Sequence, residues 1–307
     1  MDIFVQQLIN GLVLGSIYAL VALGYTMVYG ILELINFAHG EVTMVGAMVA
    51  LAVMVPLLGT GLPVVLVLLI AILAAIAACM LLGYTIERVA YRPLRRAPRL
   101  APLITAIGVS IVLQNAAMLI WGRGYISFPP IIHRETHQFM GAVITDLQMA
   151  IVALSVLIMI GLVYLVERTR LGRAMRATAQ SREVAELMGV NVNTVISATF
   201  IIGSALAAIA GVMVSAYYGL AHYYMGFMLG LKAFSAAVLG GIGNIAGAML
   251  GGLLLGVIEA LGAGYIGDLT GGFLGSNYQD VFAFMVLILV LVLRPSGLLG
   301  ERVAQRA

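Results

Sequence analysis

Long stretches without a charged residue alternate with short polar segments along the chain. Asp, Glu, Lys and Arg are absent from residues 3–32, 42–86, 100–122, 147–166, 187–231 and 233–258. A bilayer core about 30 Å thick needs roughly 20 apolar residues per helix, so each stretch is long enough for at least one crossing. The pattern therefore predicts a polytopic membrane protein.

Turn signals divide these stretches into separate helices. Pro56, Gly59, Gly61 and Pro63, for example, separate the second helix from the third. The expected fold is an all-α polytopic membrane helix bundle, one transmembrane domain over residues 1–307 with about eight spans. The expected helices are Ile3–Tyr29, Val42–Leu58, Leu62–Ile86, Ala101–Trp121, Leu147–Val166, Thr194–Tyr218, Ile245–Tyr265 and Val281–Leu293.

Composition excludes several other classes of protein. Apolar residues make up 63% of the chain and charged residues 9%, against about 45–50% and 25% in soluble domains. The net charge of +3 provides no large basic surface for nucleic acid. The single cysteine, Cys79, can form neither an intramolecular disulfide nor a multi-cysteine metal site.

The basic residues cluster in three segments, which predicts the orientation. Since positive residues favour the cytoplasmic side, the amino end and the 122–146 loop are expected outside and the carboxyl end inside. The first basic residue is Arg88, so the first apolar segment lacks the positive start of a cleavable signal peptide and should remain as a helix. The three clusters are Arg88, Arg92, Arg95, Arg96 and Arg99; Arg168, Arg170, Arg173, Arg176 and Arg182; and Arg294, Arg302 and Arg306.

Parity requires one further crossing. Three clear helices separate the second basic cluster from the third, but two segments on one side need an even number of crossings. The candidate is Met225–Gly243, which contains the only lysine, Lys232, and several glycines. We expect Lys232–Gly243 to form a short broken or re-entrant element packed within protein, and the last helix to begin before Asp280.

Glycines recur at helical spacing near the carboxyl end. Gly243, Gly247 and Gly251 are four residues apart, as are Gly252 and Gly256. On a helix this spacing produces a groove in which another backbone can lie. Packing within the subunit, a moving gate and a subunit contact are all compatible with such a groove.

The sequence contains no clear motif for catalysis or for metal binding. The lysine follows Leu231, outside any Walker A loop, so the chain has no such ATP site. His133 and His137 are four residues apart, but without a third nearby ligand solvated histidines are expected, and no metal site. The cluster Asn36, His39 and Glu41 has no nucleophile motif beside it, which favours a polar helix cap or part of a solute path over catalysis.

Two membrane-embedded charges are candidates for function. Glu259 and Lys232 interrupt apolar segments, and intramembrane ionisable residues usually mark pathways or paired interior groups. Glu259 is compatible with a buried hydrogen-bonded residue, a pathway residue or an ion-coupling group; Glu33 and Glu41 are further candidates.

The polar segment 167–193 contains a short predicted helix. Ser181 can cap it, Val184, Ala185, Leu187 and Met188 form an apolar face, and Gly189 provides the stop. About eight residues are too few for a free helix in water. The helix therefore needs a surface, either this protein's own ends and lipid headgroups or a groove on a soluble partner.

Several segments of the chain resemble those of a known family. Glu183–Gly189 is similar to the Glu-Ala-Ala-x-x-x-Gly element in the cytoplasmic loop of ABC importer permeases, with Val184 in place of an alanine and without the Ile-x-Leu-Pro that often follows. The stronger resemblance, to the first permease of the branched-chain amino-acid ABC importers, runs from Asn10 to Leu299. It is carried by Tyr25–Gly30, Ile35–Glu41, Ile86–Leu94 and Lys232–Gly243.

The resemblance implies a multi-pass subunit of the bacterial cytoplasmic membrane that imports Leu, Ile or Val. It implies a second homologous permease, two cytoplasmic ATP-binding subunits that use ATP and Mg²⁺, an external or periplasmic solute-binding protein, and no cofactor or catalysis in this chain. Permeases of urea or amide importers belong to the same subfamily, so the substrate has alternatives. Three other functional classes stay open: a secondary carrier, an intramembrane enzyme using His39 and a structural subunit. Expected coupling residues, within the 167–193 loop, are Arg173, Arg176, Ser181, Glu183, Ala185, Leu187 and Gly189; expected path residues are Asn36, His39, Glu41, Lys232, Gly240, Gly241, Asn244 and Glu259.

Overall fold

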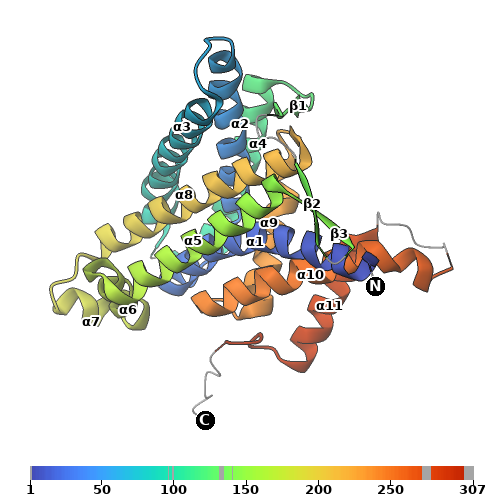
Figure 1. Ribbon diagram of the computed structural model, residues 1–307. Coiled ribbons are helices and arrows are strands. Elements are labelled where there is room, and N and C mark those ends of the chain that lie inside the picture. Colours follow the sequence, from blue (N-terminus) through green and yellow to red (C-terminus); the bar gives the residue numbers. More distant parts are fainter. Residues whose placement is uncertain are drawn as a thin grey trace. The chain divides into compact units, whose positions relative to one another are not determined.

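Helices make up nearly all of the regular structure. The computed structural model describes residues 2–95, 97–98, 100–130, 135–139, 141–271 and 278–300. Four short strands accompany the helices: β1 (Ile126–Ser127), β2 (Thr136–Phe139), β3 (Ala142–Thr145) and β4 (Leu220–Ala221). The helices are α1 (Asp2–Leu32), α2 (His39–Leu58), α3 (Val64–Thr85), α4 (Leu100–Trp121), α5 (Asp146–Arg168), α6 (Arg170–Gln180), α7 (Arg182–Leu187), α8 (Val192–Tyr218), α9 (Met225–Gly240), α10 (Ile245–Leu269) and α11 (Gln279–Leu293) (Figure 1).

The chain separates into two compact units, each assembled from distant segments. Unit 1 comprises 1–26, 132–159 and 232–307, and unit 2 comprises 27–131 and 160–231. Both units lie within the region expected to form one transmembrane domain, and that single-domain assignment stays a prediction.

In unit 2, helices α2, α3 and α8 pack against one another, and α4 packs on α2. Small residues allow the close approach. A Cβ on Gly46 would collide with the backbone of Ala208, and one on Gly211 would collide with the carbonyl of Thr43. Such small-residue contacts are typical of membrane helices, whose association depends on close packing rather than on removal of apolar surface from water.

In unit 1, glycines bring the first part of α1 against α10. Gly256 lies on the backbone of Gly15, and Gly252 lies on Ala19. Gly247 and Gly251 instead face the backbone at the end of α9. The predicted groove is therefore present, but Gly243 is not part of it: this residue lies before α10, with a φ of +96°.

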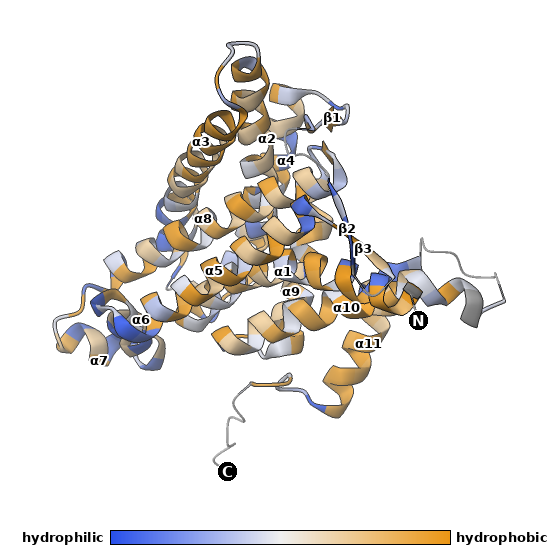
Figure 2. Ribbon diagram, in the orientation of Figure 1, coloured by the Kyte–Doolittle hydropathy of each residue, from blue (hydrophilic) through white to orange (hydrophobic). Residues whose placement is uncertain are grey.

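Seven helices of the described residues are long and apolar enough to cross a membrane. They correspond to the first seven predicted spans. The eighth, α11, begins at Gln279 as expected but has 15 residues, which cover about 22 Å at 1.5 Å per residue. Apolar residues run along α3, α5 and α8, whereas hydrophilic ones gather at α6 and α7 (Figure 2).

The predicted interruption is present, but it follows Gly240, at the end of the expected element Lys232–Gly243. Helix α9 has 16 residues and ends at Gly240, and a new helix begins at Ile245. Its length corresponds to about 24 Å, short of the roughly 30 Å of a bilayer core. The helix begins earlier than the expected element, at Met225, and its re-entry into the membrane stays a prediction.

The sequence patterns missed three local features. No strands were predicted in the 122–146 loop, but β2 and β3 form an antiparallel hairpin that pairs Thr136 with Thr145. Strand β1 pairs with β4. Helix α3 continues directly into a π-helical turn, Ile86–Tyr91. In such a turn, backbone hydrogen bonds join residues five positions apart rather than four.

Candidate functional site

The polar segment between α5 and α8 folds into two short helices. Thr169 caps α6, accepting a hydrogen bond from the amide of Gly172 at 3.1 Å. Ser181 caps α7, accepting one from the amide of Val184 at 3.3 Å. The α7 cap agrees with the sequence interpretation, whereas α6 was missed although Leu171, Met175 and Thr178 recur at helical spacing.

Gly189 ends α7 in the predicted way. Its φ is +83°, its amide donates to the carbonyl of Glu186 at 3.0 Å, and the amide of Val190 donates to Ala185 at 3.0 Å. This pair of bonds is the Schellman motif, which satisfies carbonyls at a helix end and strongly favours glycine at the left-handed position. The stop is thus built into the local sequence.

The apolar face of α7 is divided. Ala185 is 2% exposed, but Val184, Leu187 and Met188 are 57%, 86% and 79% exposed. Val184 and Leu187 on this six-residue helix, together with Met188 directly after it, leave an uncovered apolar surface in this chain. Glu183 is exposed beside them.

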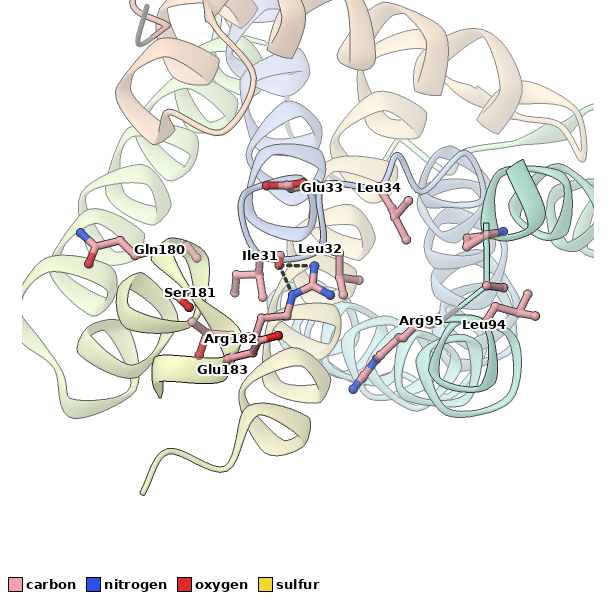
Figure 3. Close-up of a pocket in the computed structure, with 14 residues that line it drawn as sticks. Ile31, Leu32, Glu33, Leu34, Leu94, Arg95, Gln180, Ser181, Arg182 and Glu183 are labelled. Carbon is pink, nitrogen blue, oxygen red and sulfur yellow. Dashed lines mark hydrogen bonds between the residues drawn. The ribbon is translucent and has the colours of Figure 1, made fainter. Parts of the chain in front are cut away.

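Arg182, at the start of α7, contacts the end of α1. Its Nη2 and Nε atoms donate to the carbonyl oxygen of Ile31 at 2.8 and 3.1 Å, as the dashed lines in Figure 3 show. A guanidinium is favourable at this place because the last carbonyls of a helix carry partial negative charge. From the sequence, Arg182 was placed only in the second basic cluster, and this contact was not predicted because nothing local links residues 151 positions apart.

A pocket of about 400 Å³ lies beside this contact (Figure 3). Leu32, Glu33 and Leu34 border it at the end of α1, and Glu183 borders it on α7. Glu33 has a φ of +53°, the left-handed conformation that ends α1. The pocket therefore separates the short helix from the chain turn that leads to α2.

The two arginines expected to take part in coupling to ATP-binding subunits lie on α6. Arg173 and Arg176 are both exposed, and an Nη atom of Arg176 also donates to the carbonyl of Val166. Gly172 allows this corner, because a Cβ there would collide with the carbonyls at the end of α5. Arg173 is thus available to a partner, whereas Arg176 also holds the α5–α6 corner.

A second polar cluster, centred on Glu87, anchors the other arginine-rich segment. The Glu87 side chain is fully buried and forms ion pairs with Arg92, at 3.3 Å, and with Arg95. Ser197 of α8 donates to the same carboxylate at 2.7 Å. This cluster ties the π-helical turn to α8, and sequence reasoning did not identify Glu87 as its centre. Arg96 and Arg99 lie outside the described residues.

The polar segment Asn36–Glu41 leads into the first turn of α2, and its polar residues are buried. Asn36 accepts hydrogen bonds from the Tyr91 hydroxyl at 3.1 Å and from the Ala38 amide at 3.2 Å. His39 begins α2 and is 2% exposed. Glu41 Oε1 accepts from Gln114 at 2.7 Å and from Ser110 at 3.2 Å.

Lys232 and Glu259 are brought together in unit 1. Lys232 Nζ lies 2.7 Å from Glu259 Oε1 and 2.7 Å from Asp280 Oδ1. The Tyr18 hydroxyl donates to Glu259 Oε2 at 3.0 Å. Glu259 is therefore a buried, hydrogen-bonded residue, one of the alternatives left open by the sequence.

Glycines shape the connection between α9 and α10. Gly241 has a φ of +107° and lies directly against the backbone of Gly300. The amides of Leu298 and Leu299 donate to Leu239 and Gly240 at 2.9 and 2.8 Å. Asn244 caps α10 through the amide of Gly247 at 2.9 Å, so this residue has a local structural role. The amides of Leu298 and Leu299 thus satisfy carbonyls at the end of α9 that an interrupted helix would leave without a hydrogen-bond partner.

Sequence comparison shows the family of the chain. Residues 7–291 match the family model described as the permease component of branched-chain amino acid transport systems. The chain belongs to this family. The permease is accordingly an integral membrane protein, in agreement with its apolar helices.

Close relatives cover nearly the whole permease. The high-affinity branched-chain amino acid transport system permease protein BraD of Pseudomonas aeruginosa is 50% identical over 303 residues, 97% of this chain and 96% of BraD. The corresponding LivH proteins of Salmonella typhimurium and Escherichia coli K12 are each 46% identical over 303 residues, with the same coverage. No solved structure matches the chain.

Proposed function

We propose that this chain is a membrane-spanning subunit of an ATP-driven importer for leucine, isoleucine and valine. It forms part of the solute path and works with a second homologous permease, two cytoplasmic ATP-binding subunits and an external solute-binding protein. The identity of about half of all residues with BraD and LivH supports the substrate class. The subunit itself carries out no catalysis and binds no cofactor; ATP and Mg²⁺ are used by the ATP-binding subunits.

The uncovered apolar face of α7 is the observation that carries the coupling role. Leu187 and Met188 are almost fully exposed, and in water such a face favours burial in a groove of a partner. Two faces of α7 thus have separate tasks: Leu187 contacts an ATP-binding subunit, and Arg182 holds the carbonyl end of α1. The carboxyl end and the segment 167–193 are accordingly on the cytoplasmic side.

Movement of the ATP-binding subunits reaches the membrane through this contact. When ATP binding changes the position of their grooves, α7 follows, and the Arg182 guanidinium displaces the last turn of α1. Glu33 and the following turn connect that end of α1 to Asn36, His39 and Glu41, the polar residues proposed to contact the solute. The free energy for the change of state comes from differential binding of ATP to the two states.

The first test changes the stop of α7. Gly189→Val places a β-branched residue at a φ of +83°, which L-residues strongly resist. We expect loss of radiolabelled leucine uptake in the reconstituted complex, while insertion of the chain into the membrane and ATPase activity persist. Glu183→Arg should act in the same direction by reversing a charge beside the docking face.

Matched controls separate uncoupling from backbone strain. Gly61, in the α2–α3 connection, has a φ of +76° and open space around it, as Gly189 has. Gly61→Val therefore introduces similar strain away from α7, and Glu167→Arg reverses an exposed charge at the end of α5. If Gly189→Val and Glu183→Arg transport like these controls at equal permease abundance, α7 is not the coupling element.

A further inference from the structure

The β2–β3 hairpin brings three possible metal ligands together at the start of α5. A carboxylate oxygen of Glu135, a ring nitrogen of His137 and a carboxylate oxygen of Asp146 all lie within 4.8 Å of one another. Within this group, His137 Nε2 is 2.8 Å from Asp146 Oδ1. The cluster lies entirely in unit 1 and contains none of the residues expected to couple or to contact the solute.

The strand register explains why these side chains converge. Thr136 pairs with Thr145, which places Glu135 opposite Asp146, and the Asp146 amide donates to the Glu135 carbonyl at 3.3 Å. His137 is two residues from Glu135 and projects from the same face of β2. From the sequence, only the pair His133 and His137 was considered and no metal site was expected; His133 lies outside the described residues.

The hairpin is held in place by hydrogen bonds to α1. Gln6 forms two bonds with the backbone of Val143, donating at 3.0 Å and accepting at 2.8 Å. Gln148, in the first turn of α5, donates to Asn10 at 3.3 Å. Fixed backbone on both sides of the cluster lowers the conformational cost of gathering the three ligands.

We propose that Glu135, His137 and Asp146 bind a divalent transition-metal ion, with Zn²⁺ as the representative. Imidazole and carboxylate are common zinc ligands, and three protein ligands leave a fourth position for water. Two adjacent carboxylates with one imidazole carry a negative charge that a dication neutralises. The exposed side chains of Glu135 and His137 leave the site open to ions from solution.

Binding of Zn²⁺ tests this proposal without reference to transport. The full-length chain, purified in detergent without a polyhistidine tag, is titrated with Zn²⁺ in competition with a chromophoric chelator. Removal of one ligand by His137→Ala or Asp146→Asn should lower the affinity by about tenfold or more, since even supporting residues of metal sites contribute tenfold to a hundredfold.

His222→Ala is the matched control. His222 is also a histidine in a loop and is half-buried, but it stacks on Tyr125 and contacts the carbonyl of Arg123. Unchanged affinity in His222→Ala, together with weaker binding in both ligand variants, supports the site. Intact affinity in His137→Ala, or an equal loss in His222→Ala, overturns it. Thermal unfolding in EDTA verifies that all variants are folded before the titration.

Discussion

Two buried carboxylates in this permease are stabilised in different ways. Glu259 in unit 1 and Glu41 in unit 2 are both 1% exposed. Glu259 contacts the Lys232 ammonium at 2.7 Å and receives the Tyr18 hydroxyl. Glu41 receives only the neutral donors Ser110 and Gln114 among the described residues, and its Oε2 atom has no hydrogen-bond partner there.

The difference separates a structural role from a functional one. An ammonium with its carboxylates satisfies the charge of each group, and loss of one member leaves the others buried without compensation. A buried carboxylate without a cation stabilises the fold little, and such residues in membrane segments are retained for a pathway or a proton relay. From this contrast we predict that Lys232 and Glu259 contribute mainly to stability and that Glu41 contributes to transport.

Removal of the ammonium should have the largest effect. Lys232→Met leaves Glu259 and Asp280 close together without their shared cation. We expect a loss of about 3–5 kcal/mol in the free energy of unfolding, typical for one broken partner of a buried ion pair. Chemical unfolding of the purified chain in detergent measures this, with the exposed Arg123→Met as control. Equal unfolding midpoints in the two variants would contradict a structural role of Lys232.

Neutralising Glu259 should have an intermediate effect. Glu259→Gln keeps the shape of the side chain and an acceptor for Tyr18, and Lys232 retains Asp280. The expected loss in unfolding free energy is about 1.5–3 kcal/mol, the range for a hydrogen bond to a charged group. Leucine uptake per folded permease should remain near that of the unchanged protein. A loss of uptake without a loss of stability would move Glu259 to the solute path.

Neutralising Glu41 should affect stability least. Glu41→Gln preserves acceptance from Ser110 and Gln114, so the unfolding free energy should change by less than about 1 kcal/mol. Uptake of leucine by the reconstituted complex should nevertheless fall, whereas the ATPase rate remains measurable. If Glu41→Gln destabilises the chain as strongly as Lys232→Met, the contrast between the two carboxylates is wrong.

The sequence predicts local structure well because the relevant signals are local. Charge-free length locates the spans, and Ser181 and Gly189 mark the two ends of α7 through bonds within a few residues. The interruption after Gly240 also follows from local glycines and from parity. These features require no knowledge of which helices are neighbours.

The pairing of distant side chains could not be predicted in the same way. Tyr18 and Glu259 are 241 residues apart, and Arg182 and Ile31 are 151 apart. Hydropathy fixes which segments are apolar but not which faces meet. The hairpin of β2 and β3 was missed because its strands have only four residues each and neither alternates apolar with polar residues.

The contact between α1 and α10 shows how two helices that meet through small residues are aligned along their axes. On α10, Ala248, Gly252, Gly256 and Ala260 recur every fourth residue, so a slide by four residues, about 6 Å, would again place small residues on the partner. Steric fit alone hardly distinguishes the two alignments. The hydrogen bond from Tyr18 to Glu259 does, because a slide of that length would separate these atoms. The Tyr18–Glu259 hydrogen bond thus selects one alignment of α1 against α10, although the small residues along the contact nearly repeat.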